Sequence, residues 1–128
     1  MADRKPRVLV VDDASLQRLY CREILERAGF EVAEALNGIE ALESLLLAPA
    51  DLLIVDVNMP QMDGITFLNS LRRMPSPLCS IPAVVTSTES GQQDLAAARA
   101  AGANFYLIKP VSADILAEYA WLMCGTAR

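Results

Sequence analysis

The sequence predicts an α/β fold, a doubly wound parallel sheet of five strands, (βα)5. Two apolar runs, Val8–Val11 and Leu52–Val55, each lead directly into an acidic residue. Continuous apolar runs of this length are typical of strands that are covered on both faces. Five strand-like segments alternate with five helix-like segments, and this alternation favours a parallel sheet with right-handed crossovers.

Composition limits the function classes. With 128 residues, 53% hydrophobic and 21% charged, the chain is predicted to fold as one domain, residues 1–128, with an ordered core of about 6–125. The net charge of −5 argues against non-specific nucleic-acid binding. No apolar run reaches membrane-spanning length, and the N-terminus is not a signal peptide. We see no linker, repeat or output domain.

The cysteine and histidine counts exclude further chemistry. The three cysteines, Cys21, Cys79 and Cys124, lack metal-type spacing and are expected to be reduced thiols of a cytoplasmic protein. The chain has no histidine, which excludes Ser-His-Asp and Cys-His catalysis and His-ligated metals. If a phosphohistidine takes part in the function, it must belong to a partner.

The first strand, Arg7–Val11, ends at Asp12-Asp13. A helix follows it, for which Gly29 is a natural C-terminal cap. Its apolar residues fall on one stripe at helical spacing: Leu16, Leu19, Tyr20, Ile24 and Ala28.

The second strand is predicted over residues 30–35, and its glutamates, Glu31 and Glu34, favour an edge position. Asn37-Gly38 then turns the chain into a helix over residues 39–47.

The third strand, Leu52–Asp56, is followed by a loop over residues 60–64. Apolar spacing predicts a helix from Ile65 to Leu71, with Phe67 widening its apolar stripe. A short fourth strand is predicted over residues 81–86.

The fourth helix, residues 92–101, is mostly alanine, with Leu95 its only large apolar residue, and Gly102 caps it. Few large contacts predict a helix that is weakly anchored to the sheet. The last strand, residues 105–108, leads into Lys109.

Ser112 is a suitable N-cap for the final helix, with Val111 and Leu116 placed as a hydrophobic staple. The expected core stripe consists of Ile115, Leu116, Tyr119, Leu122 and Met123. Trp121 falls off this stripe, which indicates either a partly exposed aromatic or a partner contact.

In such a sheet, the carboxyl ends of the strands lie close together. The residues at or just after these ends are Asp12, Asp13, Asp56, Ser87 and Lys109. Clustered carboxylates without His or Cys favour Mg²⁺. Lys109 can pair with Asp56 or with a phosphoryl oxygen, and the Ser87 hydroxyl can donate to the same oxygens. An Asp carboxylate can itself accept a phosphoryl group.

Each of these residues also has a simpler interpretation. Asp56 could be a turn former or helix cap, and Asp13 could begin the first helix. Ser87 could cap the following helix, and Lys109 could be a solvated charge at a strand end. Their joint occurrence favours the phosphoryl site.

The chain resembles a response-regulator receiver domain of bacterial two-component signalling, with the CheY-like, flavodoxin-like fold. The resemblance covers essentially the whole chain and implies the strand order 2-1-3-4-5. It is carried by these segments: Val8 to Asp13, Leu36 to Leu42, Asp56 to Gly64, Ile81 to Ser87, Ala101 to Ala103, and Lys109-Pro110.

The resemblance implies that Asp56 is the phosphoacceptor. It implies that Asp12, Asp13, Asp56 and the backbone carbonyl of Asn58 hold Mg²⁺. Lys109 would contact the phosphoryl group and be followed by a cis peptide bond.

The resemblance also implies that Ser87 is a switch hydroxyl that contacts the phosphoryl group and that Tyr106 is a switch aromatic. Thr86 stays open as an alternative to Ser87, because the preceding loop makes counting from Asp56 unsafe. Asn58 and Glu89 occupy positions that tune how fast the phosphate is lost.

The implied partners are a histidine kinase or phosphotransfer protein, and a downstream protein that binds the surface formed by residues 92–101, residues 105–108 and the last helix. We expect a monomer or weak homodimer, and no enzymatic turnover beyond self-phosphorylation and self-dephosphorylation.

Three competing interpretations share part of the pattern. A flavodoxin-like electron carrier would need a Ser-, Thr- and Gly-rich phosphate loop after the first strand, where this chain has Asp12-Asp13-Ala14-Ser15. A haloacid-dehalogenase-type phosphatase would need Asp-x-Asp where this chain has Asp56-Val57-Asn58. A phosphorylation-independent, receiver-like binding module is disfavoured by the complete acidic set and Lys109.

Overall fold

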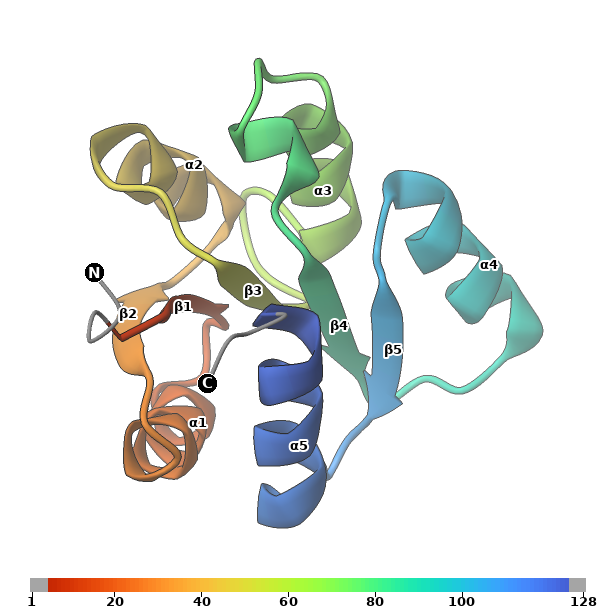
Figure 1. Ribbon diagram of the computed structural model, residues 1–128. Helices are drawn as coiled ribbons and strands as arrows, with labels where there is room; N and C mark the ends of the chain where they lie inside the picture. The colour runs from red at the N-terminus through yellow and green to blue at the C-terminus, as the bar shows by residue number, and fades with distance from the viewer. Residues whose placement is uncertain (1–4, 125–128) are drawn as a thin grey trace.

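The computed structural model describes residues 5–124, so residue 125 of the expected core lies outside the described residues. Its sheet of parallel strands has the order β2-β1-β3-β4-β5, which confirms the predicted fold (Figure 1). The strands are β1 Arg7–Val11, β2 Glu31–Ala35, β3 Leu52–Asp56, β4 Ala83–Ser87 and β5 Phe105–Ile108. The helices are α1 Ser15–Arg27, α2 Gly38–Leu47, α3 Gly64–Arg72, the short 3-10 helix Leu78–Ser80, α4 Gln92–Ala101 and α5 Ala113–Cys124.

Helices cover both faces of the sheet, with α1 and α5 on one face and α2, α3 and α4 on the other (Figure 1). Each face has its own apolar core, and β3 contributes alternate residues to both, so that all five of its residues are buried. No helix in residues 5–124 has the length and apolar content to span a bilayer.

Two strand boundaries differ from the prediction. β4 begins at Ala83, since Ile81 still belongs to the end of the 3-10 helix, and it extends to Ser87, which pairs with Ile108 of β5. β2 begins at Glu31 because the Phe30 N–H bonds to the Leu25 carbonyl in the turn that ends α1.

Side-chain caps help to fix the starts of α2 and α5. The Asn37 side chain accepts from the Glu40 N–H, and the Glu40 carboxylate accepts from the Leu36 N–H, so the predicted turn is part of a helix cap. The Ser112 hydroxyl accepts from the Ile115 N–H, which confirms Ser112 as the N-cap of α5.

The apolar stripe predicted for α1 is wrong in its first half. Leu16 is 79% exposed, and Leu19 and Tyr20 are also exposed. Cys21 and Leu25 are instead the buried residues of α1. The reason is the rotation of the helix, which directs Arg18 and Arg22 toward Glu34 of β2 and thereby turns the first apolar residues to solvent.

The buried face of α5 also differs from the predicted stripe. Leu116 and Ala120 are buried, whereas Ile115 and Leu122 are exposed. Trp121 is half-buried: its ring stacks on Phe30 at a centroid distance of 4.3 Å and its indole N–H donates to the Ala28 carbonyl. Trp121 therefore takes part in internal packing, and a partner contact through its exposed part stays a prediction.

The anchoring of α4 fits the prediction of few large contacts. Its buried residues are Ala98 and Ala101, while Leu95 is 39% exposed. Its C-terminal end is held by a charged side chain, because the Arg72 guanidinium donates to the Gly102 carbonyl.

The corrected orientation of α1 can be tested by truncating one leucine from each face. Leu25→Ala should lower the free energy of unfolding by about 2–4 kcal/mol, because it opens a cavity in a packed core. Leu16→Ala should change it by less than about 0.5 kcal/mol, as expected at an exposed position. Urea denaturation measures both, and equal losses would contradict the assigned orientation.

Candidate functional site

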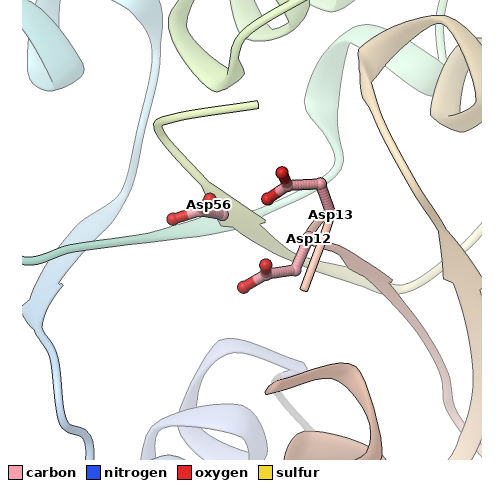
Figure 2. A group of neighbouring side chains, drawn as sticks. All are labelled: Asp12, Asp13 and Asp56. Atoms are coloured by element: carbon pink, nitrogen blue, oxygen red, sulfur yellow. The ribbon is translucent and has the colours of Figure 1, made fainter. Parts of the chain in front are cut away.

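Three carboxylates gather where β1 and β3 end (Figure 2). Asp12 and Asp13 follow β1, and Asp56 is the last residue of β3. One carboxylate oxygen from each lies within 4.8 Å of those from the other two. Asp12 and Asp56 are buried and Asp13 is exposed, so the cluster has one side open to solvent.

The turn that carries Asp12 and Asp13 is held by several hydrogen bonds. The Asp12 N–H donates to the Ala35 carbonyl at 3.1 Å, and the Asp12 carboxylate accepts from the Ala14 N–H at 2.9 Å. The N-cap of α1 is Ala14, without a side-chain cap, so Asp13 does not serve as the helix cap that its position allowed. Its carboxylate is left for the cluster.

The chain beyond Asp56 folds back closely over the end of β3. The Gly64 N–H donates to the Val57 carbonyl, and a Cβ at Gly64 would collide with the backbone carbonyl of Asp56. Asp63 caps α3 by accepting from the Thr66 N–H. This close approach requires glycine and constrains the loop before Gly64, in which Asn58 is exposed.

Lys109, at the end of β5, reaches across to the acids. Its Nζ lies 2.8 Å from Asp56 Oδ1 and 3.3 Å from Asp12 Oδ2. Burial raises the pKa of Asp56, the hydrogen bond from Lys109 lowers it, and the charges of Asp12 and Asp13 raise it further. Burial would lower the pKa of Lys109, but its hydrogen bond to Asp56 and the nearby carboxylates together raise it. The ammonium therefore stays charged at neutral pH.

The site fits a hard divalent cation. Three carboxylates and one ammonium leave a formal charge of −2, and two of the carboxylates are buried. All side-chain donors are oxygens, the ligand type that Mg²⁺ prefers. Asp12, Asp13 and Asp56 could hold such an ion.

Ser87 and Tyr106 are connected through one residue of the loop after β4. The Ser87 hydroxyl accepts from the Glu89 N–H at 3.0 Å, and the Tyr106 hydroxyl donates to the Glu89 carbonyl at 2.8 Å. Thr86 is also buried, but as its neighbour along the strand it points to the opposite face of the sheet. The contact with Glu89 favours Ser87 over Thr86 as the hydroxyl linked to this loop.

Sequence reasoning did not single out two residues that shape the site. Gly64 supports the end of β3, and Arg18 contacts the backbone between the first two acids. Arg18 had a signal in the sequence: with Arg22, four residues later, it forms a basic pair on one face of a helix that precedes an acidic edge strand. The lysine-proline bond after β5 is cis, as expected, and a second cis bond precedes Pro77.

An α/β sheet with this strand order and an acid cluster at the carboxyl ends of its strands defines a receiver-type signalling domain. Residues 8–120 match the family described as response regulator receiver domain. The chain belongs to this family, whose members act in two-component signalling.

Similar proteins agree with this assignment. The chain is 38% identical to the chemotaxis protein CheY1 of Helicobacter pylori, over 94% of this chain and 98% of that protein. It is 41% identical to the transcriptional regulatory protein PrrA of Mycobacterium tuberculosis, over 88% of this chain, but spans only about half (48%) of that relative's length.

Solved structures give the same result. Chemotaxis response regulator CheY4 of Vibrio cholerae superimposes with a TM-score of 0.86 at 31% identity, covering 94% of this chain and 99% of that chain. The signal receiver domain of a histidine kinase from Syntrophus aciditrophicus gives 0.86 at 31% identity, covering 93% and 89%.

The raised pKa of Asp56 carries a stability cost above its unfolded-state pKa, where the folded protein must hold a buried carboxylate. Asp56→Asn should therefore raise the free energy of unfolding near pH 7, without divalent cations, by on the order of 1 kcal/mol. Thermal denaturation measures this gain, which should shrink toward pH 4 as Asp56 of the parent protein becomes protonated. A loss of stability at pH 7 would contradict the assigned cost of holding the Asp56 carboxylate buried and charged.

Proposed function

We propose that the protein is a phosphoryl acceptor of a two-component phosphorelay, with Asp56 as the phosphoacceptor. The observation that carries the proposal is the buried Asp56 carboxylate, which contacts the Lys109 ammonium and lies beside two further acids. Because the chain has no histidine, the donor would be a phosphohistidine of a partner histidine kinase or phosphotransfer protein.

In the transfer step, an Asp56 carboxylate oxygen attacks the phosphorus of the donor. A P–O bond forms while the P–N bond breaks, and the electron pair of that bond stays with the donor imidazole. The product is an acyl phosphate on Asp56. Lys109, whose Nζ lies 2.8 Å from Asp56 Oδ1, would keep contact with the reacting group and offset the charge that gathers on the phosphoryl oxygens.

We propose Mg²⁺ as the cation held by Asp12, Asp13, Asp56 and the Asn58 carbonyl. When bound, it supplies charge neutralisation for the carboxylates and the phosphoryl oxygens. Asp12 and Asp13 would supply carboxylate ligands to the ion. Gly64 would fix the loop that contains Asn58. The side chains of Asn58 and Glu89 are exposed, and in this proposal they would tune how fast the phosphate is lost.

The signal would pass from Asp56 to the surface through Ser87 and Tyr106. In the unphosphorylated structure, the Ser87 hydroxyl accepts a hydrogen bond from the Glu89 N–H. A phosphoryl group on Asp56 would offer this hydroxyl a new acceptor. If Ser87 turns, the Glu89 loop is released from it and the Tyr106 hydrogen bond to that loop changes. The loop leads into α4, whose buried contacts are small, so the populations of the α4-β5-α5 surface would shift.

The α4-β5-α5 surface is the proposed binding site for the downstream protein. It exposes several large apolar side chains in the described structure: Leu95, Phe105, Ile108, Ile115 and Leu122. Patches of this kind are typical of protein contacts. A phosphorylation-independent binding module would use the same surface, and the two functions differ in whether Asp56 is ever modified.

Incubation with Mg²⁺ and acetyl phosphate should add one phosphoryl group to the protein, measured by intact mass. The gain should be absent without Mg²⁺ and absent in Asp56→Asn, because the ion neutralises the carboxylates and Asp56 is the acceptor. Ser87→Ala serves as a matched control that keeps the acids and should still be modified. No gain with any donor would leave the binding-only module as the function.

Ser87→Ala should uncouple modification from the surface change. In the parent protein, phosphorylation should shift the NMR amide signals of α4 and β5. In Ser87→Ala we expect these shifts to fall several-fold while the signals around Asp56 still move, because the hydroxyl that links the two is missing. Full shifts in Ser87→Ala, together with their loss in Thr86→Ala, would assign the switch to Thr86.

A further inference from the structure

We propose that Arg18 is a positioning residue for the metal site, acting through the backbone between Asp12 and Asp13 and depending on Glu34 for its own placement. This inference rests on the proposed function, since it concerns how the acids are set to bind the cation. Arg18 does not touch the ion or the phosphoryl group in this account.

The contact that carries the inference is made by the guanidinium of Arg18. Its Nη1 donates to the backbone carbonyl of Asp12 at 2.8 Å. That carbonyl belongs to the peptide plane joining Asp12 to Asp13, so the bond restricts rotation of the plane from which both side chains depart. Within the described part of the chain, the Asp13 carboxylate accepts no hydrogen bond, and its direction therefore depends on the backbone.

Glu34 holds the other side of the same guanidinium. Arg18 Nε donates to Glu34 Oε1 at 2.8 Å, and Arg22 Nε donates to Glu34 Oε2 at 2.6 Å. Hydrogen bonds from Arg22 and Arg18 lower the pKa of Glu34, so it is ionised at neutral pH. The Arg18 side chain is 14% exposed, which leaves it little freedom to leave this position.

The planar guanidinium of Arg18 suits this position because its two acceptors, the Glu34 carboxylate and the Asp12 carbonyl, lie on different elements. Glu34 is in β2, and the Asp12 carbonyl follows β1. A guanidinium offers separate donors in a fixed plane and can bind both at once, whereas an ammonium on a flexible stem holds them less well. Arg22, which shares Glu34 and also bonds to Glu26, provides a matched control because it donates no hydrogen bond to the described acid turn.

A purely electrostatic role and a positioning role of Arg18 predict opposite changes in cation affinity when Arg18 is replaced. If Arg18 acted only through its positive charge, its removal would strengthen cation binding to the neighbouring acids. If it positions the turn, its removal weakens binding although the local charge becomes more negative. Residues that orient metal ligands typically change affinity by about 10–100-fold, and a contact to one backbone carbonyl should lie at or below the lower end of this range.

The test is a Mg²⁺ titration of the unphosphorylated protein at constant ionic strength, followed by NMR amide shifts. Arg18→Met should raise the Kd for Mg²⁺ by about 3- to 10-fold, whereas Arg22→Met should leave it within about twofold of the parent value, because Arg22 donates no hydrogen bond to the described acid turn. An unchanged or lower Kd in Arg18→Met would overturn the proposal. If Arg18→Met fails to fold, Arg18→Lys provides the test. A raised Kd for Mg²⁺ in Arg18→Lys would support positioning by the guanidinium, and an unchanged Kd would overturn it.

A second readout separates positioning from a general loss of structure. The Mg²⁺ concentration for half-maximal phosphorylation by acetyl phosphate should rise in Arg18→Met, while the rate at saturating Mg²⁺ stays near that of the parent. A lower saturating rate with an unchanged Mg²⁺ requirement would contradict the proposal. Failure of the parent protein to bind Mg²⁺ would instead contradict the proposed function.

Discussion

The structure depends on one electrostatic constraint, the meeting of three carboxylates with a single ammonium at one edge of the sheet. Lys109 contacts Asp12 and Asp56, and so joins the ends of β1, β3 and β5. One positive charge cannot neutralise three acids, two of which are buried. The remaining negative charge disfavours the folded state and favours a divalent cation. In the proposed function, the same cation would also offset the negative charge of the incoming phosphoryl group.

The backbone holds this arrangement by close and directional contacts. Gly64 lets the chain return against the carbonyl of Asp56, and the Asp12–Asp13 turn bonds to β2 and to Arg18. On the neighbouring strands β4 and β5, hydrogen bonds link Ser87 through Glu89 to Tyr106, and the loop after β4 leads to a helix with small buried contacts. In the proposed function, this link would connect Asp56 to the weakly anchored helix α4.

Much of the fold and site could be predicted from the sequence because the informative patterns are short. The apolar runs ending in Asp12-Asp13 and Asp56 fixed β1 and β3, and the alternation of elements indicated the parallel sheet. The burial of α1 and α5 could not be predicted in this way, since the rotation of a helix depends on its neighbours: the contact of Arg18 and Arg22 with Glu34 turns Leu16 outward. The packing of Trp121 on Phe30 likewise joins residues far apart in the sequence.

The most direct test of the central claim is chemical trapping of the modified residue. Borohydride reduces an acyl phosphate of aspartate to homoserine but leaves free carboxylates unchanged, so peptide mapping after phosphorylation and reduction reads the acceptor directly. If Asp56 is the phosphoacceptor, homoserine should appear at position 56, and positions 12 and 13 should remain aspartate. Homoserine at position 12 or 13, or phosphorylated protein without homoserine, would contradict the assignment of Asp56.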